Sequence, residues 1–363
     1  MKILDRYILR ELLGPFAFGV AAFTSIMFAG KELFRITELL AEYHAPLITA
    51  AQLVLLHLPS LVVLTLPMAM LLAALLGFGR LSGDSETVAL FAGGISLYRV
   101  AVPVIMMAIV VTAVSFVLNE VVAPTTNSRH EAIMRDLTNE PLSSDKPFFV
   151  IVSENSVTDL IFYVQRGFDA SKGTLRDVAI VQYWKNRPAV FIYAKEAVWK
   201  GKNEWILKNG YTQNLGSKAT VVVPFTESQT REVRINRTPE QLAMYQKKPD
   251  ELTFGELREY IHILQKQGAE VNEFRVRLYQ KIAVPLASLV FALVGTPLGL
   301  RPHRSSSAMG LGLAIVIIFA YYVLMHYTFI LGRNGTISPA TASFLPTLVG
   351  IATGVALIFR AAK

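Results

Sequence analysis

Long runs of apolar residues, separated by short polar stretches, dominate the pattern of this chain. A helix needs about 20 residues to cross the roughly 30 Å hydrocarbon layer of a bilayer, because each residue adds about 1.5 Å. Three such runs lie in the first third of the chain and three lie at its end, with a longer polar stretch between them. The pattern predicts six transmembrane helices, at 12–30, 45–79, 100–118, 282–300, 305–332 and 337–359.

The second apolar run contains no Asp, Glu, Lys or Arg and is longer than one span requires. Pro59 and Pro67 lie inside it. Because proline removes a backbone hydrogen bond and kinks a helix, we expect a bend or an additional outer segment in this helix.

The stretch between the third and fourth runs consists of short segments rich in β-branched and aromatic residues. Turn signals such as Asn209-Gly210 separate these segments. Many short strands at this spacing are typical of a sandwich or a jelly-roll-like barrel. The predicted strands are 147–153, 160–166, 178–184, 189–197, 204–208, 221–225 and 232–235.

From Asp250 onward the apolar residues return to helical spacing. They predict a helix at 250–267, which is either a hinge or a simple linker back to the membrane. The predicted fold class is therefore an α-helical membrane protein with six transmembrane helices, three plus three, and an inserted β-jelly-roll-like domain. The predicted divisions are 1–125 (helices one to three), 126–249 (β domain), 250–272 (connecting helix) and 273–363 (helices four to six).

Basic residues beside the apolar runs predict the orientation in the membrane, because Lys and Arg are enriched in short cytoplasmic loops. If the N-terminus is cytoplasmic, only Lys31, Arg35 and Arg333 lie in the two short outer loops. Both termini are then cytoplasmic, and the β domain is periplasmic in a bacterial inner membrane. The cytoplasmic set is larger: Lys2, Arg6, Arg10, Arg80, Arg99, Arg301, Arg304, Arg360 and Lys363.

The composition agrees with a membrane protein. Hydrophobic residues make up 53% of the chain and charged residues only 17%, whereas an ordinary soluble domain is about a quarter charged. The net charge of +8 raises the question of nucleic acid, but most basic residues outside the β insert flank apolar runs, so we expect no nucleic-acid partner. The chain has no cysteine, which excludes disulfides and thiolate chemistry. The first run shows no signal-peptide cleavage site.

The sequence contains no recognisable catalytic motif. It lacks the phosphate-binding pattern G-x-x-x-x-G-K-[ST], the zinc motif H-E-x-x-H and the nucleophile motif G-x-S-x-G. We therefore expect no catalytic, metal-binding or cofactor-binding residues, and no enzyme activity, in this chain. His57 and His326 lie within predicted spans, where an imidazole is either packed or facing a cavity, or serves as a proton relay.

The loop between the second and third runs predicts a short helix at about 83–93. Asp84 or Ser85 is suited to cap this helix, and Glu86 then lies in the first turn, where the helix dipole favours a negative charge. Apolar residues share one face, and two glycines end the helix. Such a helix is suited either to dock into the groove of a partner or to lie flat on the bilayer surface. The shared face consists of Thr87, Leu90 and Phe91, and the glycines are Gly93 and Gly94.

Two basic residues, Lys31 and Arg35, lie four residues apart at the outer end of the first run. This spacing places them on one helix face, where two cations can bind phosphate or another anion. Alternatively, both side chains extend to the membrane interface in the ordinary way, aided by Glu32 and Glu38.

Several short stretches along the chain occur in an order that is specific to one family. They are 4–8 (LDRYI), 30–35 (GKELFR), 64–81, 84–86 (DSE), 92–94 (AGG), 119–124 (NEVVAP) and 291–301 (FALVGTPLGLR). In these stretches and in its three-plus-three topology, nearly the whole chain resembles the LptF/LptG (YjgP/YjgQ) family of lipopolysaccharide export permeases.

The resemblance implies a permease subunit of an ATP-driven exporter. Such permeases work as an LptF–LptG pair with a dimeric cytosolic ATPase, LptB, which would bind the ATP and Mg, so that this chain needs no cofactor of its own. The pair extracts lipopolysaccharide from the inner membrane and passes it over periplasmic β-jelly-rolls to a periplasmic bridge of LptC and LptA.

The resemblance also implies roles for individual residues. The short helix between the second and third spans corresponds to the coupling helix of the family, whose acidic residue engages the ATPase and is Glu86 here. Lys31 and Arg35 correspond to the basic residues that face the phosphates of lipid A in the cavity. The residues expected at the ATPase contact are Asp84, Ser85, Glu86, Leu90 and Phe91.

Two other functions remain compatible with the pattern. One is a permease subunit for another amphiphilic lipid or a lipoprotein, although the familiar lipoprotein-release permeases have four spans rather than six. The other is a non-transporting membrane scaffold that presents a periplasmic β domain.

Overall fold

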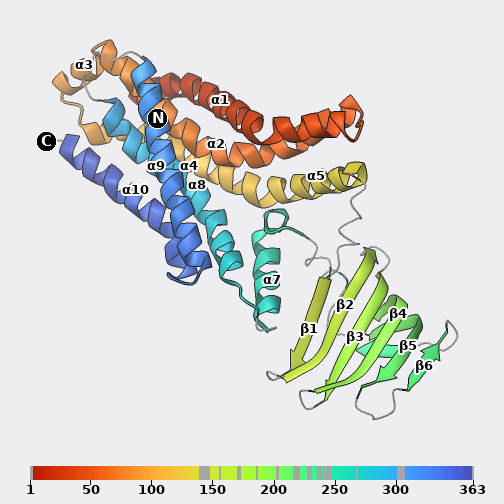
Figure 1. Cartoon of the computed structure of the whole chain (residues 1–363). Helices are drawn as coiled ribbons and strands as arrows, with labels where there is room; N and C mark the ends of the chain where they lie inside the picture. The colour runs from red at the N-terminus through yellow and green to blue at the C-terminus, as the bar shows by residue number, and fades with distance from the viewer. Residues whose placement is uncertain are drawn as a thin grey trace. The chain divides into compact units, whose positions relative to one another are not determined.

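The structure is a computed structural model of the chain (Figure 1). Its contacts divide the chain into two compact units: Met1–Asn127 together with Asn272–Lys363, which we call the helical unit, and Ser128–Val271, which we call the β unit. The residues that the structure describes are 3–138, 148–154, 157–169, 173–184, 187–201, 204–215, 221–226, 231–234, 239, 242, 247–266, 269–300 and 307–361.

Six helices are long and apolar enough to cross a membrane, counted over the described residues. This confirms the number that the apolar runs predict. The helices are α1 (Ile3–Ala41), α2 (Leu47–Gly83), α4 (Leu97–Val117), α8 (Asn272–Gly299), α9 (Ser307–Arg333) and α10 (Pro339–Ala361), and α4 continues through a π-helical turn, η1 (Leu118–Val122), into α5 (Ala123–Thr138).

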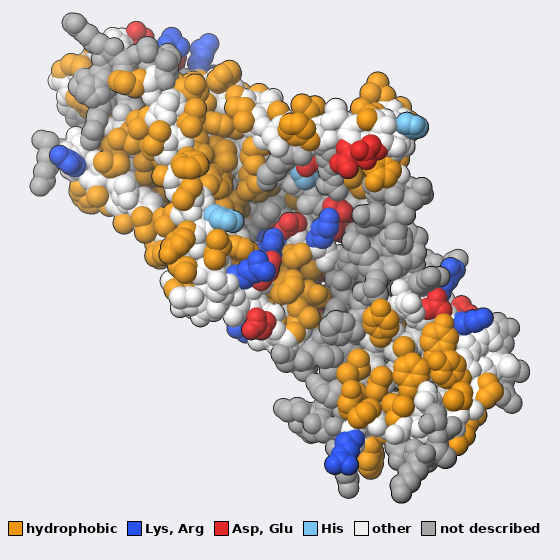
Figure 2. Space-filling view, viewed as in Figure 1, with side chains coloured by type: hydrophobic (Ala, Val, Ile, Leu, Met, Phe, Trp, Pro, Cys, Tyr) orange, Lys and Arg blue, Asp and Glu red, His pale blue; other side chains and the backbone are white. Residues whose placement is uncertain are grey.

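The surface of the helical unit is suited to contact with lipid. Figure 2 shows hydrophobic side chains over most of its visible face, with charged side chains at the margins. Large apolar residues such as Val110 on α4 and Phe319 on α9 are exposed. A contiguous apolar surface of this kind is rare on soluble monomers, so these faces require a hydrocarbon environment.

The helix α2 forms the centre of the helical unit. It packs against α1, α4, α8 and α9, and most of its apolar length is buried, whereas α1 and α9 bury only a small part of theirs. A helix that is apolar on every side is stable when other helices surround it. The uncharged composition of α2 therefore matches its central position.

Proline inside α2 leaves a backbone carbonyl that a neighbouring helix satisfies. Pro67 has no N–H, so the carbonyl of Val63, four residues earlier, lacks its normal helical donor. The hydroxyl of Ser115 on α4 donates to that carbonyl at 3.4 Å. The hydroxyl of Tyr322 on α9 donates to the next carbonyl, that of Leu64, at 3.1 Å. Pro59 and Pro67 both lie inside the one continuous helix α2, and side chains of two other spans contact its backbone beside Pro67.

The same arrangement recurs on α8. Pro285 leaves the carbonyl of Lys281 without a helical donor, and the side-chain amide of Asn119 donates to it at 3.1 Å. Asn119 belongs to the π-helical turn η1. Single π-helical turns inside α-helices occur frequently at functional sites.

Small residues allow α2 and α8 to approach closely. A Cβ atom added to Gly295 would lie 2.8 Å from the Cβ of Ala74, and one added to Gly299 would lie 2.7 Å from the Ala74 carbonyl oxygen. Gly295 and Gly299 are four residues apart and so lie on one helix face. Any side chain at either position would push the two central helices apart.

The described strands of the β unit form one antiparallel sheet. In the described residues the order is β1-β2-β3-β4-β5-β6, and β7 pairs with the same strand as β6, namely β5. This confirms an inserted β domain with seven strands. The strands are β1 (Phe148–Glu154), β2 (Val157–Asp169), β3 (Thr174–Trp184), β4 (Arg187–Gly201), β5 (Glu204–Asn214), β6 (Val222–Phe225) and β7 (Arg231–Arg234).

The connectivity is simpler than the expected jelly-roll. Consecutive strands are hydrogen-bonded neighbours, so the described strands form an up-and-down meander rather than strands that alternate between two facing sheets. The strand β6 pairs with residues 210–213 of β5 and β7 with residues 204–207, so these two strands lie one after the other along one edge of β5.

One predicted turn lies inside a strand instead. Asn209-Gly210 was expected to separate two strands, but β5 continues through it. Asn209 has a φ of 52°, and the backbone of Tyr193 on β4 leaves no room for a Cβ atom at Gly210. The pair therefore marks a local irregularity in β5 and a close approach of β5 to the backbone of β4. Glycine inside a strand often has this role instead of marking a turn.

Alternation along the strands places one face of the sheet in the core. Phe162, Ile180 and Ile192 lie opposite one another on β2, β3 and β4 and are fully buried. Tyr193 and Tyr211, on the other face, are only half-buried. The core of the β unit comprises Leu160, Phe162, Val164, Leu175, Val178, Ile180, Ile192, Ala194, Ala197, Trp205, Leu207, Phe225, Val233 and Leu242.

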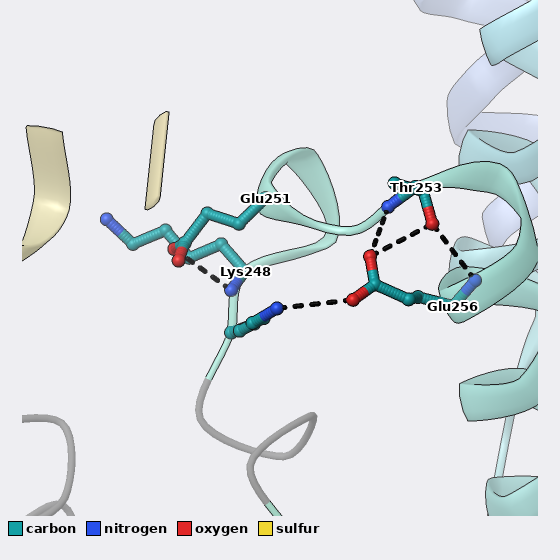
Figure 3. Close-up of polar contacts among 5 residues, drawn as sticks. Lys248, Glu251, Thr253 and Glu256 are labelled. Atoms are coloured by element: carbon teal, nitrogen blue, oxygen red, sulfur yellow. Dashed lines mark hydrogen bonds and ion pairs between the residues drawn. The ribbon is translucent and has the colours of Figure 1, made fainter. Parts of the chain in front are cut away.

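A capped helix, α7 (Phe254–Lys266), follows the strands. Figure 3 shows how its first turn is stabilised. The Thr253 N–H donates to Glu256 Oε2 at 2.8 Å, and the Glu256 N–H donates to the Thr253 hydroxyl at 3.3 Å. This reciprocal pair is a capping box, and Thr253-x-x-Glu256 is its sequence signature. One turn earlier, the Lys248 N–H donates to Glu251 Oε1 at 3.1 Å, and Lys247 donates to Glu256 Oε1 at 3.3 Å.

The capping contacts lower the pKa of Glu256. Partial burial alone would raise the pKa of this carboxyl, but the N–H and hydroxyl of Thr253 and the ammonium of Lys247 outweigh it, so the pKa lies below its ordinary value. This lowered pKa makes the stability of the start of α7 depend on pH. A group whose pKa is lower in the folded state stabilises the fold above its unfolded pKa, and this contribution is lost as the pH falls through the folded pKa.

We predict that the start of α7 loosens in acid because Glu256 becomes protonated. Hydrogen–deuterium exchange of the first-turn amides of α7 should lose protection between about pH 5 and pH 3 in the wild-type chain. In Glu256→Gln, which keeps an acceptor but cannot titrate, protection should change much less over that range. Equal loss of protection in both proteins would contradict the prediction.

We also predict that Asn119 stabilises the helical unit through the carbonyl that Pro285 leaves free. Asn119→Ala should destabilise the chain by about 1–2 kcal/mol, the usual effect of leaving one buried carbonyl unsatisfied, measured as a lower unfolding temperature in detergent. Pro285→Ala restores an N–H that can donate to the Lys281 carbonyl within the helix. Asn119→Ala should therefore reduce stability less in the Pro285→Ala background than in the wild-type chain. Additive losses in the double variant would exclude this explanation.

Candidate functional site

The short helix α3 (Glu86–Ala92) connects α2 to α4 at one end of the helical unit (Figure 1). The beginning of α1 contacts α3 there through Tyr7. The ring of Tyr98, near the start of α4, packs against Phe359 near the end of α10, with centroids 6.3 Å apart. We call this end of the helical unit the α3 end.

The start of α3 differs from the predicted cap. Ser85 occupies the N-cap position, but its side chain makes no capping hydrogen bond and its φ is 60°. Asp84 is the C-cap residue of α2, and its N–H donates to the carbonyl of Arg80 at 2.9 Å. A capping side chain needs an extended N-cap backbone. The two-residue turn from α2 into α3 leaves no such residue, so the predicted cap was wrong.

The end of α3 confirms the predicted glycine stop. Gly94 has a φ of 81°, a conformation that favours glycine. The Ile95 N–H donates to the Leu90 carbonyl at 3.1 Å and the Gly94 N–H to the Phe91 carbonyl at 3.0 Å. These two bonds form a Schellman motif, which closes the helix and satisfies its last carbonyls.

The outer face of α3 is apolar. Val88 is 56% exposed and Phe91 40% exposed, whereas Leu90 is half-buried and Thr87 is only 2% exposed. Thr87 therefore faces the helical unit and does not share the exposed face on which the sequence placed it. The predicted face did not include Val88, although Val88 lies three residues before Phe91, a spacing that places two residues on one helix face. We call Glu86, Val88 and Phe91 the α3 surface.

Polar contacts bind α3 and its two flanking helix ends to α1. The Tyr7 hydroxyl donates to Glu86 Oε2 at 2.5 Å. Arg80, at the end of α2, lies 3.0 Å from a Glu11 carboxylate oxygen, and Arg99, at the start of α4, lies 2.6 Å from Asp5. We call these three contacts the α1 clamp; its residues are Asp5, Tyr7, Glu11, Arg80, Glu86 and Arg99.

The contacts of the α1 clamp differ in strength. Asp5 is buried and Arg99 is largely covered, so removing either partner would leave a charge with poor solvation. Arg80 is mostly exposed, and its second contact, with Asp84 at 3.9 Å, joins two exposed side chains. Such surface pairs contribute little. The buried pair with Asp5 is therefore the main electrostatic link between α1 and α4 at this end.

The sequence pattern does not reveal the α1 clamp. Tyr7 and Glu86 are separated by 79 positions, and no local spacing relates Asp5 to Arg99. Contacts between residues so far apart in the chain depend on helix packing, which periodicity does not specify. The only signal present was the repeated placement of acidic residues at the start of α1 and of arginines beside the loop.

The predicted anion site at Lys31 and Arg35 is only partly described. Both residues lie in the continuous helix α1, four positions apart, but their side chains lie outside the described residues. Their neighbour Glu32 is buried, and its Oε1 lies 3.3 Å from Nε2 of His57 on α2. Glu32 therefore faces α2, and its carboxylate is an acidic neighbour of the His57 imidazole.

Comparison with known proteins identifies relatives over nearly the whole chain. The family model described as "Lipopolysaccharide export system permease LptF/LptG" matches residues 6–360. The lipopolysaccharide export system permease protein LptG of Escherichia coli (strain K12) is 27% identical over 344 residues, which cover 89% of this chain and 88% of the relative. The protein of the same name from Haemophilus influenzae is 25% identical over 295 residues, 78% of each chain.

Proposed function

Because this chain belongs to the LptF/LptG family of lipopolysaccharide export permeases, we propose that it is the membrane-embedded subunit of an ATP-driven exporter. In this proposal the exporter extracts lipopolysaccharide from the bacterial inner membrane and passes it to a periplasmic bridge. Family membership supports lipopolysaccharide over the other amphiphilic substrates and over the scaffold that the sequence alone left open.

The α3 surface is the observation that supports coupling to an ATPase. A helix of two turns presents an acid beside two exposed apolar side chains, Val88 and Phe91, and the α1 clamp holds it to the helical unit. Apolar side chains next to a charge suit a groove on a protein partner better than open water. We propose that the partner is a dimeric cytosolic ATPase, LptB, and that Glu86 accepts hydrogen bonds from a basic residue of its docking groove.

The energetics of the substrate call for such a partner. Drawing acyl chains out of a bilayer costs about 0.8 kcal/mol for each CH₂ group exposed, which amounts to a large cost for a lipid with several chains. In our proposal ATP and Mg are bound by the ATPase, and this chain supplies the path for the lipid.

Basic residues support the proposed orientation. Arg80 and Arg99 lie at the α3 end, as do Arg6 and Arg10 in the first turns of α1. By the positive-inside rule we assign the α3 end, with both termini, to the cytoplasm. The β unit then lies in the periplasm, where it would deliver lipopolysaccharide to LptC and LptA.

The apolar faces of the spanning helices suit a second permease subunit as well as lipid. We propose that this chain pairs with a paralogous six-span permease and that the substrate enters a cavity between the two. Lys31 and Arg35 lie on one face of α1, at the end opposite to α3. We assign them to the phosphates of lipid A, because pairs of cations bind phosphate through charge-assisted hydrogen bonds.

We predict that Glu86→Lys abolishes assembly with the ATPase, because it replaces an acceptor with a like charge facing a basic groove. The measurement is co-purification of proteins and lipids with the tagged chain in detergent, followed by mass spectrometry. The wild-type chain should recover an ATPase, a second six-span permease and lipopolysaccharide. Glu42→Lys, an exposed substitution of the same type in the turn that follows α1, should recover all three. Wild-type recovery of the ATPase with Glu86→Lys would exclude this docking role.

We further predict that Lys31→Glu lowers capture of lipopolysaccharide without loss of the ATPase, because it places a negative charge against phosphate. Photo-crosslinking of lipopolysaccharide in the purified complex measures the capture. Lys31→Arg, which keeps the charge, should retain most of the crosslinking. Undiminished crosslinking in Lys31→Glu would remove Lys31 from the substrate path.

A further inference from the structure

One contact of the α1 clamp involves the acid that we assign to the ATPase contact. The Tyr7 hydroxyl donates to Glu86 Oε2 at 2.5 Å, within the short range of hydrogen bonds from a hydroxyl to a carboxylate. We propose that Tyr7 is the positioning residue of Glu86, and that this bond transmits movement of α3 to α1. The proposal rests on the proposed function and adds a second residue to the same site.

The bond to Tyr7 leaves half of the carboxylate available. A carboxylate has two oxygens and accepts several hydrogen bonds. Tyr7 takes one position at Oε2, and no hydrogen bond to Oε1 occurs among the described residues. A glutamate side chain is otherwise free to rotate about three bonds, which costs entropy when it is fixed by a partner. Tyr7 therefore directs Glu86 before the ATPase binds, and the partner meets an oriented acceptor.

The two ion pairs of the α1 clamp lie on either side of this bond. Arg80 precedes α3 and contacts Glu11, while Arg99 follows α3 and contacts Asp5. The three α1 residues Asp5, Tyr7 and Glu11 lie within two turns of one helix. Any displacement of α3 toward or away from the ATPase must therefore either break these contacts or move the beginning of α1.

The helix α1 extends the effect to the opposite end of the helical unit. It is continuous from Ile3 to Ala41, and it buries only a small part of its apolar length. Although α1 packs along α2, it lies at the side of the helical unit rather than at its centre, so fewer helices restrain it than restrain α2. The substrate-facing positions Lys31 and Arg35 belong to this same helix, so the Tyr7–Glu86 bond joins the ATPase contact to the substrate end through one element.

The test uses the full-length chain, its co-purified ATPase and second permease, and lipopolysaccharide in proteoliposomes. Tyr7→Phe removes only the hydroxyl. We expect the apparent affinity for the ATPase to fall by no more than about tenfold, as for loss of one partly exposed hydrogen bond to a charge. We expect the amount of lipopolysaccharide released per ATP hydrolysed, measured at saturating ATPase, to fall severalfold. A purely structural role of Tyr7 would lower assembly without changing this ratio.

Two further variants complete the test. Tyr98→Phe is the matched control, since Tyr98 is an exposed tyrosine at the α3 end whose hydroxyl makes no hydrogen bond among the described residues. It should keep the wild-type ratio. Tyr7→Phe should add nothing further in a Glu86→Ala background, where the acceptor is gone, if Tyr7 acts through Glu86.

The outcomes separate this inference from the proposed function. A wild-type ratio in Tyr7→Phe, together with a lowered ratio in Glu86→Ala, would overturn the role of Tyr7 and leave the proposed function intact. Additive losses in the double variant would also overturn it. If the wild-type chain recovers no ATPase, both the proposed function and this inference fail.

Discussion

The hydrocarbon layer of a membrane contains no water to hydrogen-bond a free backbone group, and every carbonyl within it must find a partner inside the protein. Regular helices meet this requirement except where proline interrupts them. In this chain Ser115 and Asn119, on the α4 segment, each donate to a carbonyl that a proline in another helix leaves free. These bonds determine how α4 packs against α2 and α8, and the π-helical turn η1 brings Asn119 to its position.

Once the backbone is satisfied, close packing determines which helices are central. The uncharged α2 and the glycine face of α8 approach each other at Ala74, Gly295 and Gly299, and side chains of both helices form the buried clusters of the helical unit. The helix α1 is more exposed. It packs along α2 and makes polar contacts near its two ends, at Tyr7 with Glu86 and at Glu32 with His57. Its two anchored ends coincide with the proposed ATPase contact and the proposed substrate contact.

The β unit follows a different rule, because one face of its sheet forms a core and the other does not. Alternating residues bury Phe162, Ile180 and Ile192 across three strands, whereas Asn209-Gly210 accommodates a local irregularity in β5. The capping box of Thr253 and Glu256 then starts α7 at a defined residue.

The sequence by itself determined the six spans, the inserted β domain and the glycine stop of α3, since each depends on local periodicity or on the conformation of single residues. It failed where two local signals compete, as at Asn209-Gly210, and where a cap needed backbone that the α2–α3 turn does not provide, as at Ser85. Only the tertiary structure determined which residues form the α1 clamp and which side chains donate to the carbonyls that prolines leave free. Tyr7 meets Glu86, and Asn119 meets the Lys281 carbonyl, across 79 and 162 positions of sequence. Helix packing brings such residues together, and apolar periodicity specifies which face of a helix is buried but not which helix lies against it.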